Sequence, residues 1–491
     1  MPLLAAPICA ALRSGDRHTA ARLQDELAWI VAAAVSWAMV GVAGGLFWAT
    51  RDGQILSYAV GGWAPPWGIE LRIDTLNALV LLVVTAIGAV TATFARRSIG
   101  VEIPAERHSL FYAAWMLAFT GLLGIAVTGD AFNLFVFLEI SSLSSYVMIA
   151  LGRDRRAIVA AFQYLIMGTI GATFLLIGVA FMYMMTGTLN MDDLAQRLPA
   201  VADTATIRAA FAFLTVGIAL KVAVFPLHLW LPNAYAYAPS AVSAFIAATA
   251  TKVALYALMR FSFTVFGPEY AFQTVSFQFV LLPLSVLGLL VTSIVAIFQA
   301  DAKRLLAYSS VAQIGYMTLG LSLATAAGVA AAVLHLFNHA LMKGALFLAL
   351  GCVMYRLGSV RIDRMAGLAR EMPWTMAAFV VAGLSLIGVP LTAGFISKWY
   401  LVLAAIDKGW WPIAALIVFA SLLAAVYVWR VVEVAYLRPA PTDRAAVNEA
   451  PAGLLVPTWI LAAANLYFGI DSSLPVGAAT RAAAQLVGGA P

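Results

Sequence analysis

Long apolar runs separated by short polar segments set the pattern of this chain. A membrane-spanning helix needs about 20 mainly apolar residues. Thirteen runs approach or exceed that length, at residues 27–48, 74–94, 109–128, 131–151, 157–186, 207–226, 239–262, 276–299, 304–325, 327–354, 374–406, 412–436 and 453–470. The opening run, MPLLAAPICAAL, is shorter and lacks the basic region of a signal peptide, so we interpret it as a clipped further helix. The pattern predicts an all-α polytopic membrane protein with about 13–14 transmembrane helices.

Composition and charge agree with that class. Of the 491 residues, 63% are hydrophobic and 11% are charged, far from the balance of a soluble domain. Arginine and lysine concentrate in one set of alternate loops, for example at 153–156 and 356–370, and are sparser in the other set. By the positive-inside rule the richer loops are cytoplasmic. We therefore expect a bacterial inner-membrane protein with its C-terminus outside, and no basic cluster that suggests a nucleic-acid partner.

The sequence lacks the usual signatures of cofactor binding. Cys9 and Cys352 are isolated, so they form no disulfide framework or iron–sulfur ligand set. The glycines are scattered through apolar segments and form no Walker or dinucleotide-binding loop. We therefore expect no bound cofactor or metal. The chain is interpreted as part of a translocase that an ion gradient or partner subunits would power, without redox chemistry of its own.

Ionisable residues inside the predicted spans are the main functional signal. They are Glu139, Lys221, Lys252, His335, His339 and Lys398. A charged side chain at the centre of a bilayer costs about 2.5–3.5 kcal/mol or more, so such groups usually face the bundle interior and mark an ion or proton path. Burial favours a neutral lysine, a nearby carboxylate favours a charged one, and histidine can relay protons between them. We expect a proton relay that follows these residues in the order given.

Two predicted spans are interrupted by proline near a relay lysine. Pro226 and Pro232 follow Lys221, and Pro390 precedes Lys398. A helix broken by proline is tolerated within a membrane only where protein or water satisfies the freed backbone groups. The breaks fall in the seventh and twelfth helices, each the fourth in a run of five, which is typical of an inverted repeat. Within a single membrane domain we expect N-terminal helices at 1–107, repeats at 108–262 and 276–436, and a last helix with a tail at 437–491.

Structural roles compete with proton transfer at several positions. A buried lysine can snorkel toward the headgroups. His335 and His339 lie four residues apart and could bind zinc if a third ligand were near. Lys343, one turn further along that face, is either an accessory group or structural. His228, at the first break, is either a proton-entry group or a capping partner.

Two further polar pairs have simpler interpretations. Lys303 and Arg304 open a predicted helix at the cytoplasmic edge, where a topology role is expected. Arg430 and Glu433 are three residues apart, which predicts a local ion pair.

Five segments carry a resemblance to a known family. They are TGDAFNLFVFLEISSLSSYVMIAL, LKVAVFPLHLWLPNAYAYAPSAVSAFIAATATKVALYALMR, DAKRLLAYSSVAQIGYM, LHLFNHALMKGALFLALG and GVPLTAGFISKWYL. Over about residues 70–435 the chain resembles the antiporter-like subunits shared by respiratory complex I, membrane-bound hydrogenases and Mrp-type sodium/proton antiporters. The resemblance implies fourteen helices, two inverted five-helix repeats and a charged axis at mid-membrane. That axis comprises Glu139 on the fifth helix, Lys221 on the broken seventh, Lys252 on the eighth, His335 and His339 on the eleventh, and Lys398 on the broken twelfth.

Within that family the resemblance favours the Mrp D protein. The segment GGWAPPWGIELRIDTLNALVLLVV is similar to it, and a lysine at position 398 resembles both the D protein of Mrp antiporters and the N protein of complex I. This implies a proton-translocating subunit of a multi-subunit monovalent cation (Na⁺)/proton antiporter, with other membrane subunits as partners. The alternative is a proton-pumping subunit of an NADH-quinone oxidoreductase or hydrogenase-type complex. In a third class, a stand-alone solute carrier or inert scaffold, the buried relay argues against the scaffold and the resemblance argues against the carrier.

Overall fold

The computed structural model describes residues 1–12 and 18–488 and is built almost entirely of helices. The α-helices are α1 (Pro2–Ala11), α2 (His18–Ala49), α3 (Thr75–Glu102), α4 (His108–Val127), α5 (Ala131–Ala150), α6 (Arg155–Thr186), α7 (Met191–Arg197), α8 (Ala205–Val222), α9 (Leu231–Tyr237), α10 (Ser240–Met259), α11 (Gln278–Ile297), α12 (Ala302–Ser322), α13 (Ala326–Leu357), α14 (Leu368–Glu371), α15 (Pro373–Ile387), α16 (Ala393–Asp407), α17 (Trp411–Leu437), α18 (Ala452–Ile470) and α19 (Ser473–Val487). Short 3₁₀ segments are η1 (Val60–Gly62), η2 (Ala105–Arg107), η3 (Leu198–Val201) and η6 (Ile362–Met365), and π-helical turns are η4 (Arg260–Val265) and η5 (Glu269–Thr274).

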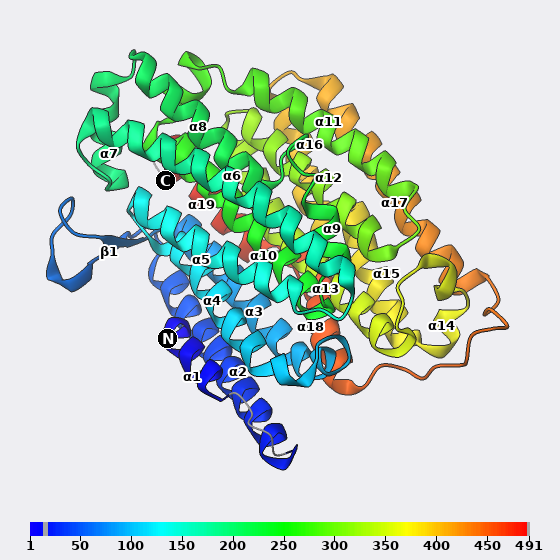
Figure 1. Ribbon diagram of the computed structural model, residues 1–491. Helices are drawn as coiled ribbons and strands as arrows, with labels where there is room; N and C mark the ends of the chain where they lie inside the picture. Colours follow the sequence, from blue (N-terminus) through cyan, green and yellow to red (C-terminus); the bar gives the residue numbers. More distant parts are fainter. Residues whose placement is uncertain (13–17, 489–491) are drawn as a thin grey trace.

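The helices lie side by side in one bundle, from which a β-hairpin projects (Figure 1). The hairpin pairs β1 (Leu56–Ala59) antiparallel with β2 (Glu70–Ile73), with Leu56 opposite Ile73. It leads directly into α3, whose N-terminus is capped by Asp74 in a capping box with Asn77. We call this end of the bundle the hairpin end.

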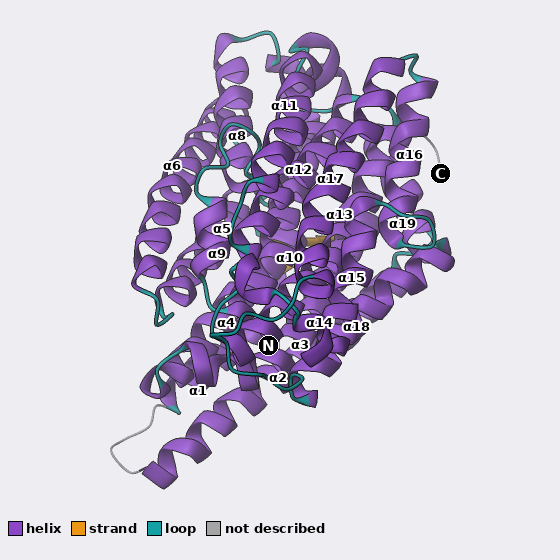
Figure 2. Cartoon of the chain, turned by 90° about the vertical axis from the view of Figure 1, so that its right-hand side faces the viewer, coloured by secondary structure: helices purple, strands orange, loops and turns teal. Residues whose placement is uncertain are grey.

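Three helices form the centre of the bundle. All of the most apolar stretch of α13 is buried, with 94% of that of α10 and 83% of that of α3, against 22% for α2. α10 packs against both α13 and α3, and α10 and α13 lie in the middle in both views (Figures 1 and 2). Outer helices expose large apolar side chains such as Phe162 and Phe419. Such side chains are suited to contact with lipid, because these outer helices are apolar all round. The central helices α3, α10 and α13 are shielded from lipid by the rest of the bundle.

The predicted all-α polytopic fold is confirmed. Eleven helices in the described residues are long and apolar enough to cross a membrane, and α12 is a further long helix with more polar residues. The spans predicted at 207–226 and 374–406 are both interrupted, because α8 ends at Val222 and α15 at Ile387. α1 has 10 residues and reaches only about 15 Å at 1.5 Å per residue, so it packs as a partial helix against α4. The sequence analysis missed α19, whose alanine-rich sequence lacks a long apolar run.

Two groups of helices, α4–α10 and α11–α17, share several structural features. α6 and α13 each have 32 residues and each end at a left-handed glycine. The segment that follows each of them forms a β-bridge with the aspartate that caps the helix before it, Asn190 with Asp130 and Arg361 with Asp301. Arg153, just after α5, lines the same cavity as Asp301, just before α12. The two capped helices therefore start at opposite ends of the bundle. We call the end with Arg153 and Arg361 the arginine-rich end.

Candidate functional site

Lys221 and Glu139 meet between α8 and α5. Lys221 lies in the last turn of α8, just before the chain turns at Ala223 with a φ of 65°. Its Nζ donates to Ser142 Oγ at 2.8 Å and lies 3.5 Å from Glu139 Oε1. The side chain of Lys221 is 6% exposed, whereas that of Glu139 is 25% exposed. The structure thus brings the predicted pair together, with Ser142 as a third member and Glu139 reaching the surface of this chain.

Neighbouring side chains satisfy the break after α8. The carbonyl of Leu220 accepts a hydrogen bond from Trp230 Nε1 at 2.9 Å. Pro226 lies within the break, and Pro232 occupies the first turn of α9, where the missing N–H is harmless. The Trp230 ring stacks on Tyr164 with centroids 3.9 Å apart. The Trp230 side chain therefore pairs one backbone carbonyl beside the break, as membrane depth requires.

Lys252 is fully buried in the middle of α10. Its Nζ donates to Thr251 Oγ1 at 3.3 Å and to the carbonyl of Ala247. A cavity of about 30 Å³ separates the Lys221 region from α10, and it is lined by Lys221, Ser142, Ser145 and Ala250. That volume suffices for about one water molecule, and the serine hydroxyls supply polar partners. The cavity thus lies between Lys221 and a face of α10 that carries alanines, and Lys252 does not line it.

His335 joins three helices. Its Nδ1 lies 2.8 Å from Ser397 Oγ on α16, and its Nε2 lies 2.9 Å from Gln313 Oε1 on α12. The ring of His339, one turn further along α13, lies parallel to it with centroids 6.1 Å apart. Within the described residues neither ring nitrogen of His339 has a hydrogen-bond partner. Both ring nitrogens of His335 therefore have hydrogen-bond partners, whereas those of His339 lie in the buried interior of the bundle.

Lys398 bonds to the backbone at the break between α15 and α16. Its Nζ donates to the carbonyls of Leu386 and Ile387, both at 2.9 Å, and to Ser421 Oγ at 3.1 Å. These carbonyls end α15 and are freed by the break that contains Gly388 and Pro390. The ammonium also lies 4.6 Å from the centroid of the Tyr316 ring, a favourable cation–π position.

The two accessory residues differ in their contacts. Lys343 is fully buried and donates to the carbonyl of Leu306 at 2.8 Å and to Ser309 Oγ, both on α12. His228 lies in the first break with its ring stacked on Phe225 at 5.3 Å, and its Nδ1 makes no hydrogen bond to the described residues. Lys343 therefore extends the buried polar axis, whereas His228 stands apart from it.

Carboxylates are scarce along this axis. In the part of the chain that the structure describes, Lys221 alone of the predicted relay lysines has a carboxylate partner, and Lys252 and Lys398 bond only to hydroxyl and carbonyl oxygens. Each uncompensated charge at such depth costs about 2.5–3.5 kcal/mol or more. The chain therefore cannot hold all of its axis lysines charged without penalty, and the arrangement suits a small number of protons shared among several bases.

Residues 128–424 match the family model described as NADH:quinone oxidoreductase/Mrp antiporter, TM. This chain belongs to that family. The N protein of the NADH-quinone oxidoreductase of Desulforudis audaxviator is 46% identical over 430 residues, which cover 85% of each chain. The D protein of the Na⁺/H⁺ antiporter of Alkalihalophilus pseudofirmus is 31% identical over 410 residues, covering 84% of this chain and 82% of that one. A chain in the structure of the Mrp complex from Dietzia sp. DQ12-45-1b superposes with a TM-score of 0.89 at 27% identity, covering 99% of this chain and 96% of that one.

These comparisons confirm the family inferred from the motifs. They also include both branches that the sequence left open, because one relative is named as part of an NADH-quinone oxidoreductase and another as part of a Na⁺/H⁺ antiporter. The structural match to the Mrp complex is a match to one subunit of a larger assembly. This NADH:quinone oxidoreductase/Mrp antiporter family member is therefore a multi-pass membrane subunit with membrane partners.

Sequence reasoning missed the neutral partners of the axis. Ser142, Gln313, Ser397 and Ser421 contact the predicted lysines and histidines, yet none was singled out. One signal was present: AYSSVAQIGYM places Ser309, Ser310 and Gln313 at helical spacing inside an otherwise apolar span. Polar residues at that spacing share a helix face, and this face is the one that meets α13.

One of the two simpler interpretations was wrong for this family member. Arg430 does not pair with Glu433: it donates to the carbonyls of Ile297 and Gln299 at the end of α11, and Glu433 pairs with Arg438 at 2.9 Å. The orphan carbonyls of a helix end attract arginine. Lys303 lies in the first turn of α12, as the sequence predicts, but it is 1% exposed and lies 3.8 Å from Glu102.

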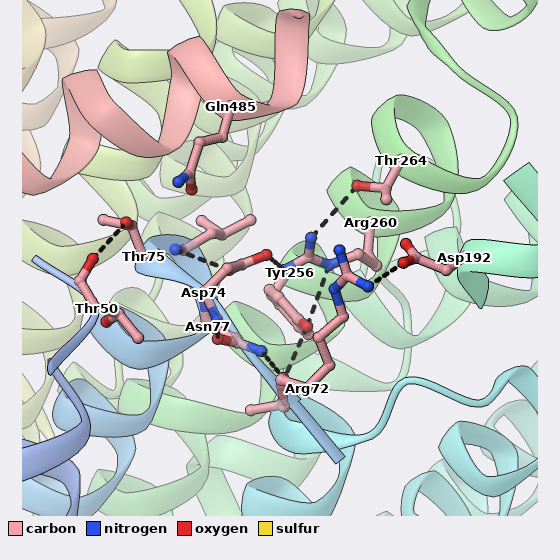
Figure 3. A network of polar contacts seen from close by, with 12 residues as sticks. Thr50, Arg72, Asp74, Thr75, Asn77, Asp192, Tyr256, Arg260, Thr264 and Gln485 are labelled. Carbon is pink, nitrogen blue, oxygen red and sulfur yellow. Dashed lines mark hydrogen bonds and ion pairs between the residues drawn. The ribbon is translucent and has the colours of Figure 1, made fainter. Parts of the chain in front are cut away.

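At the hairpin end, α10 leads into a second polar network (Figure 3). Arg260, two turns beyond Lys252, pairs with Asp74 at 2.7 Å and donates to Tyr256 Oη at 3.3 Å. Tyr256 in turn donates to the carbonyl of Ala126 at 3.1 Å. An outer cavity of about 210 Å³ ends at Asp74 and Arg260, whose side chains are each only 10% exposed. The Asp74–Arg260 ion pair therefore separates the outer cavity from the interior of the bundle at the hairpin end.

Proposed function

We propose that this chain is the proton-translocating subunit of a multi-subunit Mrp-type Na⁺/proton antiporter. Protons would pass along the axis of Glu139, Lys221, Lys252, His335 with His339, and Lys398. The observation that carries the proposal is the burial of five basic side chains, Lys221, Lys252, His335, His339 and Lys398, whose hydrogen-bond partners are mostly neutral. The relative named as the D protein of a Na⁺/H⁺ antiporter and the full-length likeness to a subunit of the Mrp complex support it.

The relay would work by shifting charge at its first pair. While Glu139 is close to Lys221, the carboxylate favours a protonated lysine. Movement of the carboxylate away would favour release of that proton toward Lys252. The proton would then pass to the histidines of α13 and on to Lys398, because hydroxyl and imidazole groups can both accept and donate.

A second candidate is a proton-pumping subunit of a redox-driven complex. The relative at 46% identity is named as the N protein of an NADH-quinone oxidoreductase, which favours this candidate. The axis would serve in the same way in both assemblies. The two candidates differ in the energy source, which lies in the partner subunits.

The proposal includes an orientation and an internal repeat. We place the arginine-rich end in the cytoplasm of a bacterial inner membrane and the C-terminus outside, following the positive-inside rule. We also divide the single membrane domain into N-terminal helices at 1–107, inverted repeats at 108–262 and 276–436, and a final segment at 437–491. The matched caps, bridges and breaks of the two helix groups support that division.

Lys221→Ala tests the proposed function. We expect the complex to assemble while proton-coupled transport falls by about a hundredfold, within the range that positioned proton-transfer groups contribute. Transport would be measured in vesicles that contain the whole complex, with a pH-sensitive dye. Lys408→Ala is the matched control, because Lys408 follows α16 outside the axis. Equal transport by the two variants would remove Lys221 from the path.

A further inference from the structure

A large polar cavity opens at the arginine-rich end, separate from the predicted relay. Its volume is about 570 Å³, and both helix groups line it, through Arg153 and Tyr237 of the first and Arg304 and Arg361 of the second. Asp301, which caps α12, also lines it. Burial raises the pKa of the Asp301 carboxyl above its ordinary value. The cavity thus brings solvent-facing titratable groups to the boundary between the two groups of helices.

The floor of this cavity is a buried ion pair. Lys303 Nζ lies 3.8 Å from Glu102 Oε2 and donates to the carbonyl of Ala238 at 3.1 Å. Glu102 accepts hydrogen bonds from the backbone N–H and the hydroxyl of Ser240, at 2.9 and 3.0 Å, at the start of α10. The pair could serve only to fasten α3, α10 and α12 together. That structural role would not require the lysine to be able to lose its proton.

From Lys303 a polar face of α12 leads inward to the axis. Lys303, Leu306, Ser309 and Gln313 follow one another at spacings of three or four residues, which places them on one side of the helix. Lys343 donates to the Leu306 carbonyl and to Ser309, and Gln313 contacts His335. One helix face therefore connects the cavity floor with Lys343 and with the central histidine. The predicted relay does not use this connection.

The two ends of the bundle differ in the basic residue of their buried ion pair. At the hairpin end the buried pair contains Arg260, and arginine keeps its charge at any accessible pH. At the arginine-rich end the pair contains Lys303, whose amine can exist in both protonation states. A fixed charge repels an incoming proton, whereas a lysine can pass one on. The difference favours proton exchange with the solvent at the arginine-rich end.

We propose that this cavity is the vestibule through which the axis exchanges protons with the solvent at the arginine-rich end, and that Lys303, paired with Glu102, passes protons between Lys343 and the cavity along the polar face of α12. The proposal rests on the proposed function and adds an exchange point to it. In the antiport direction, the Lys303 ammonium gives its proton to a water molecule of the cavity, which leaves as hydronium. The Lys343 ammonium then gives its proton to the neutral amine of Lys303, so the pair with Glu102 returns to its starting charge.

A single introduced cysteine tests the vestibule. Met354→Cys places a thiol on the apolar part of the cavity wall, and Thr442→Cys places one on an exposed loop that does not line the cavity. The native thiols of Cys9 and Cys352 are buried, so the parent protein is the unlabelled control. Inside-out vesicles of the whole complex would be treated with membrane-impermeant sulfonatoethyl methanethiosulfonate, labelling measured by mass, and transport measured with a pH dye.

We expect labelled Met354→Cys to lose at least about nine-tenths of its transport and to recover it when the reagent is removed by reduction, while labelled Thr442→Cys transports like the parent. Normal transport by fully labelled Met354→Cys overturns the vestibule. So does a thiol that the reagent reaches only from the other face of the membrane. Absence of proton-coupled transport in the parent complex would instead contradict the proposed function, which keeps the two failures apart.

The Lys303→Arg variant distinguishes a role of Lys303 in proton transfer from a purely structural role. Arginine keeps the charge and the contacts to Glu102 and Ala238, so a merely structural pair should tolerate it. We expect the variant to assemble with the thermal stability of the parent and to lose transport nearly as completely as Lys303→Met. Parent-like transport by Lys303→Arg would overturn the role of Lys303 in proton transfer.

Discussion

At the scale of single residues, most of the basic side chains of the axis have neutral hydrogen-bond partners. Lys252 and Lys398 bond to hydroxyl and carbonyl oxygens, and His335 bonds to a hydroxyl and an amide oxygen. A serine hydroxyl can accept from an ammonium and donate to a neutral amine. Such partners tolerate both protonation states of a lysine. Lys221 differs because a carboxylate faces it.

Glu139 should act through its charge. Glu139→Gln keeps the shape and a hydrogen-bonding group beside Lys221 but removes the charge, so we expect a loss of transport of about tenfold or more, given that one pKa unit of lost interaction is a factor of ten. Glu139→Asp keeps the charge at a greater distance and should retain part of the activity. Vesicle transport at matched expression measures both. If Gln performs as well as Asp, the ion pair has no part in the mechanism.

Lys398 tests whether the second group of helices carries protons. Its Nζ has three oxygen acceptors and a tyrosine ring within reach, and the guanidinium of Lys398→Arg could keep several of these contacts. An arginine cannot release its proton. We therefore expect Lys398→Arg to transport nearly as poorly as Lys398→Ala. Mild impairment by arginine and severe impairment by alanine would assign Lys398 to anchoring the broken helix.

At the scale of elements, the two broken helices place their lysines differently. Lys221 precedes its break on α8, whereas Lys398 follows its break on α16 and reaches back to the carbonyls that end α15. Gly388 makes this return possible. Its φ is 91°, and a Cβ built there would lie 2.9 Å from Lys398 Cδ. The second break is therefore shaped around the side chain of Lys398.

Gly388→Ala should displace Lys398. A left-handed non-glycine residue costs about 1–2 kcal/mol, and overpacking at the site costs a further 1–3 kcal/mol or so. We expect lower thermal stability together with strongly reduced transport. Gly187→Ala is the control, because Gly187 is also left-handed, with φ of 71°, but a Cβ there would meet nothing within 4 Å. If both variants lose the same stability and the same transport, contact with Lys398 is not the cause.

Sequence reasoning reached the spans, the breaks and the ionisable residues because each has a one-dimensional signal. Apolar length marks a span, proline marks a break, and a charge inside a span marks a buried site. It missed Ser397 and Ser421, because small hydroxyls in helices also bond to their own backbone. It missed the partners of Lys303 and Arg430, because Glu102 and Ile297 lie far away along the chain. Those contacts depend on helix packing.

At the scale of the whole molecule, the predicted axis begins at the surface of the chain and ends in its interior, because Lys398 is buried. Glu139 keeps a quarter of its side chain exposed, although it lies in the middle of a membrane-spanning helix. A carboxylate exposed at that depth would face hydrocarbon in an isolated chain, which is costly. A membrane partner packed against α5 would remove that cost. The exposure of Glu139 therefore agrees with the membership of this chain in a multi-subunit assembly.

The composition of that assembly decides between the two proposed functions. The chain has no cysteine pair or nucleotide loop of its own, so a redox-driven complex would draw its iron–sulfur or quinone chemistry from other subunits. We expect the complex purified from native membranes in mild detergent to lack iron–sulfur absorbance. Reconstituted in vesicles, it should exchange Na⁺ for protons when a pH gradient alone is imposed, measured with a pH-sensitive dye and with potassium in place of sodium as the control. Proton movement that instead requires a reductant and a quinone would assign the chain to the redox-driven branch, while leaving the same buried axis as its path.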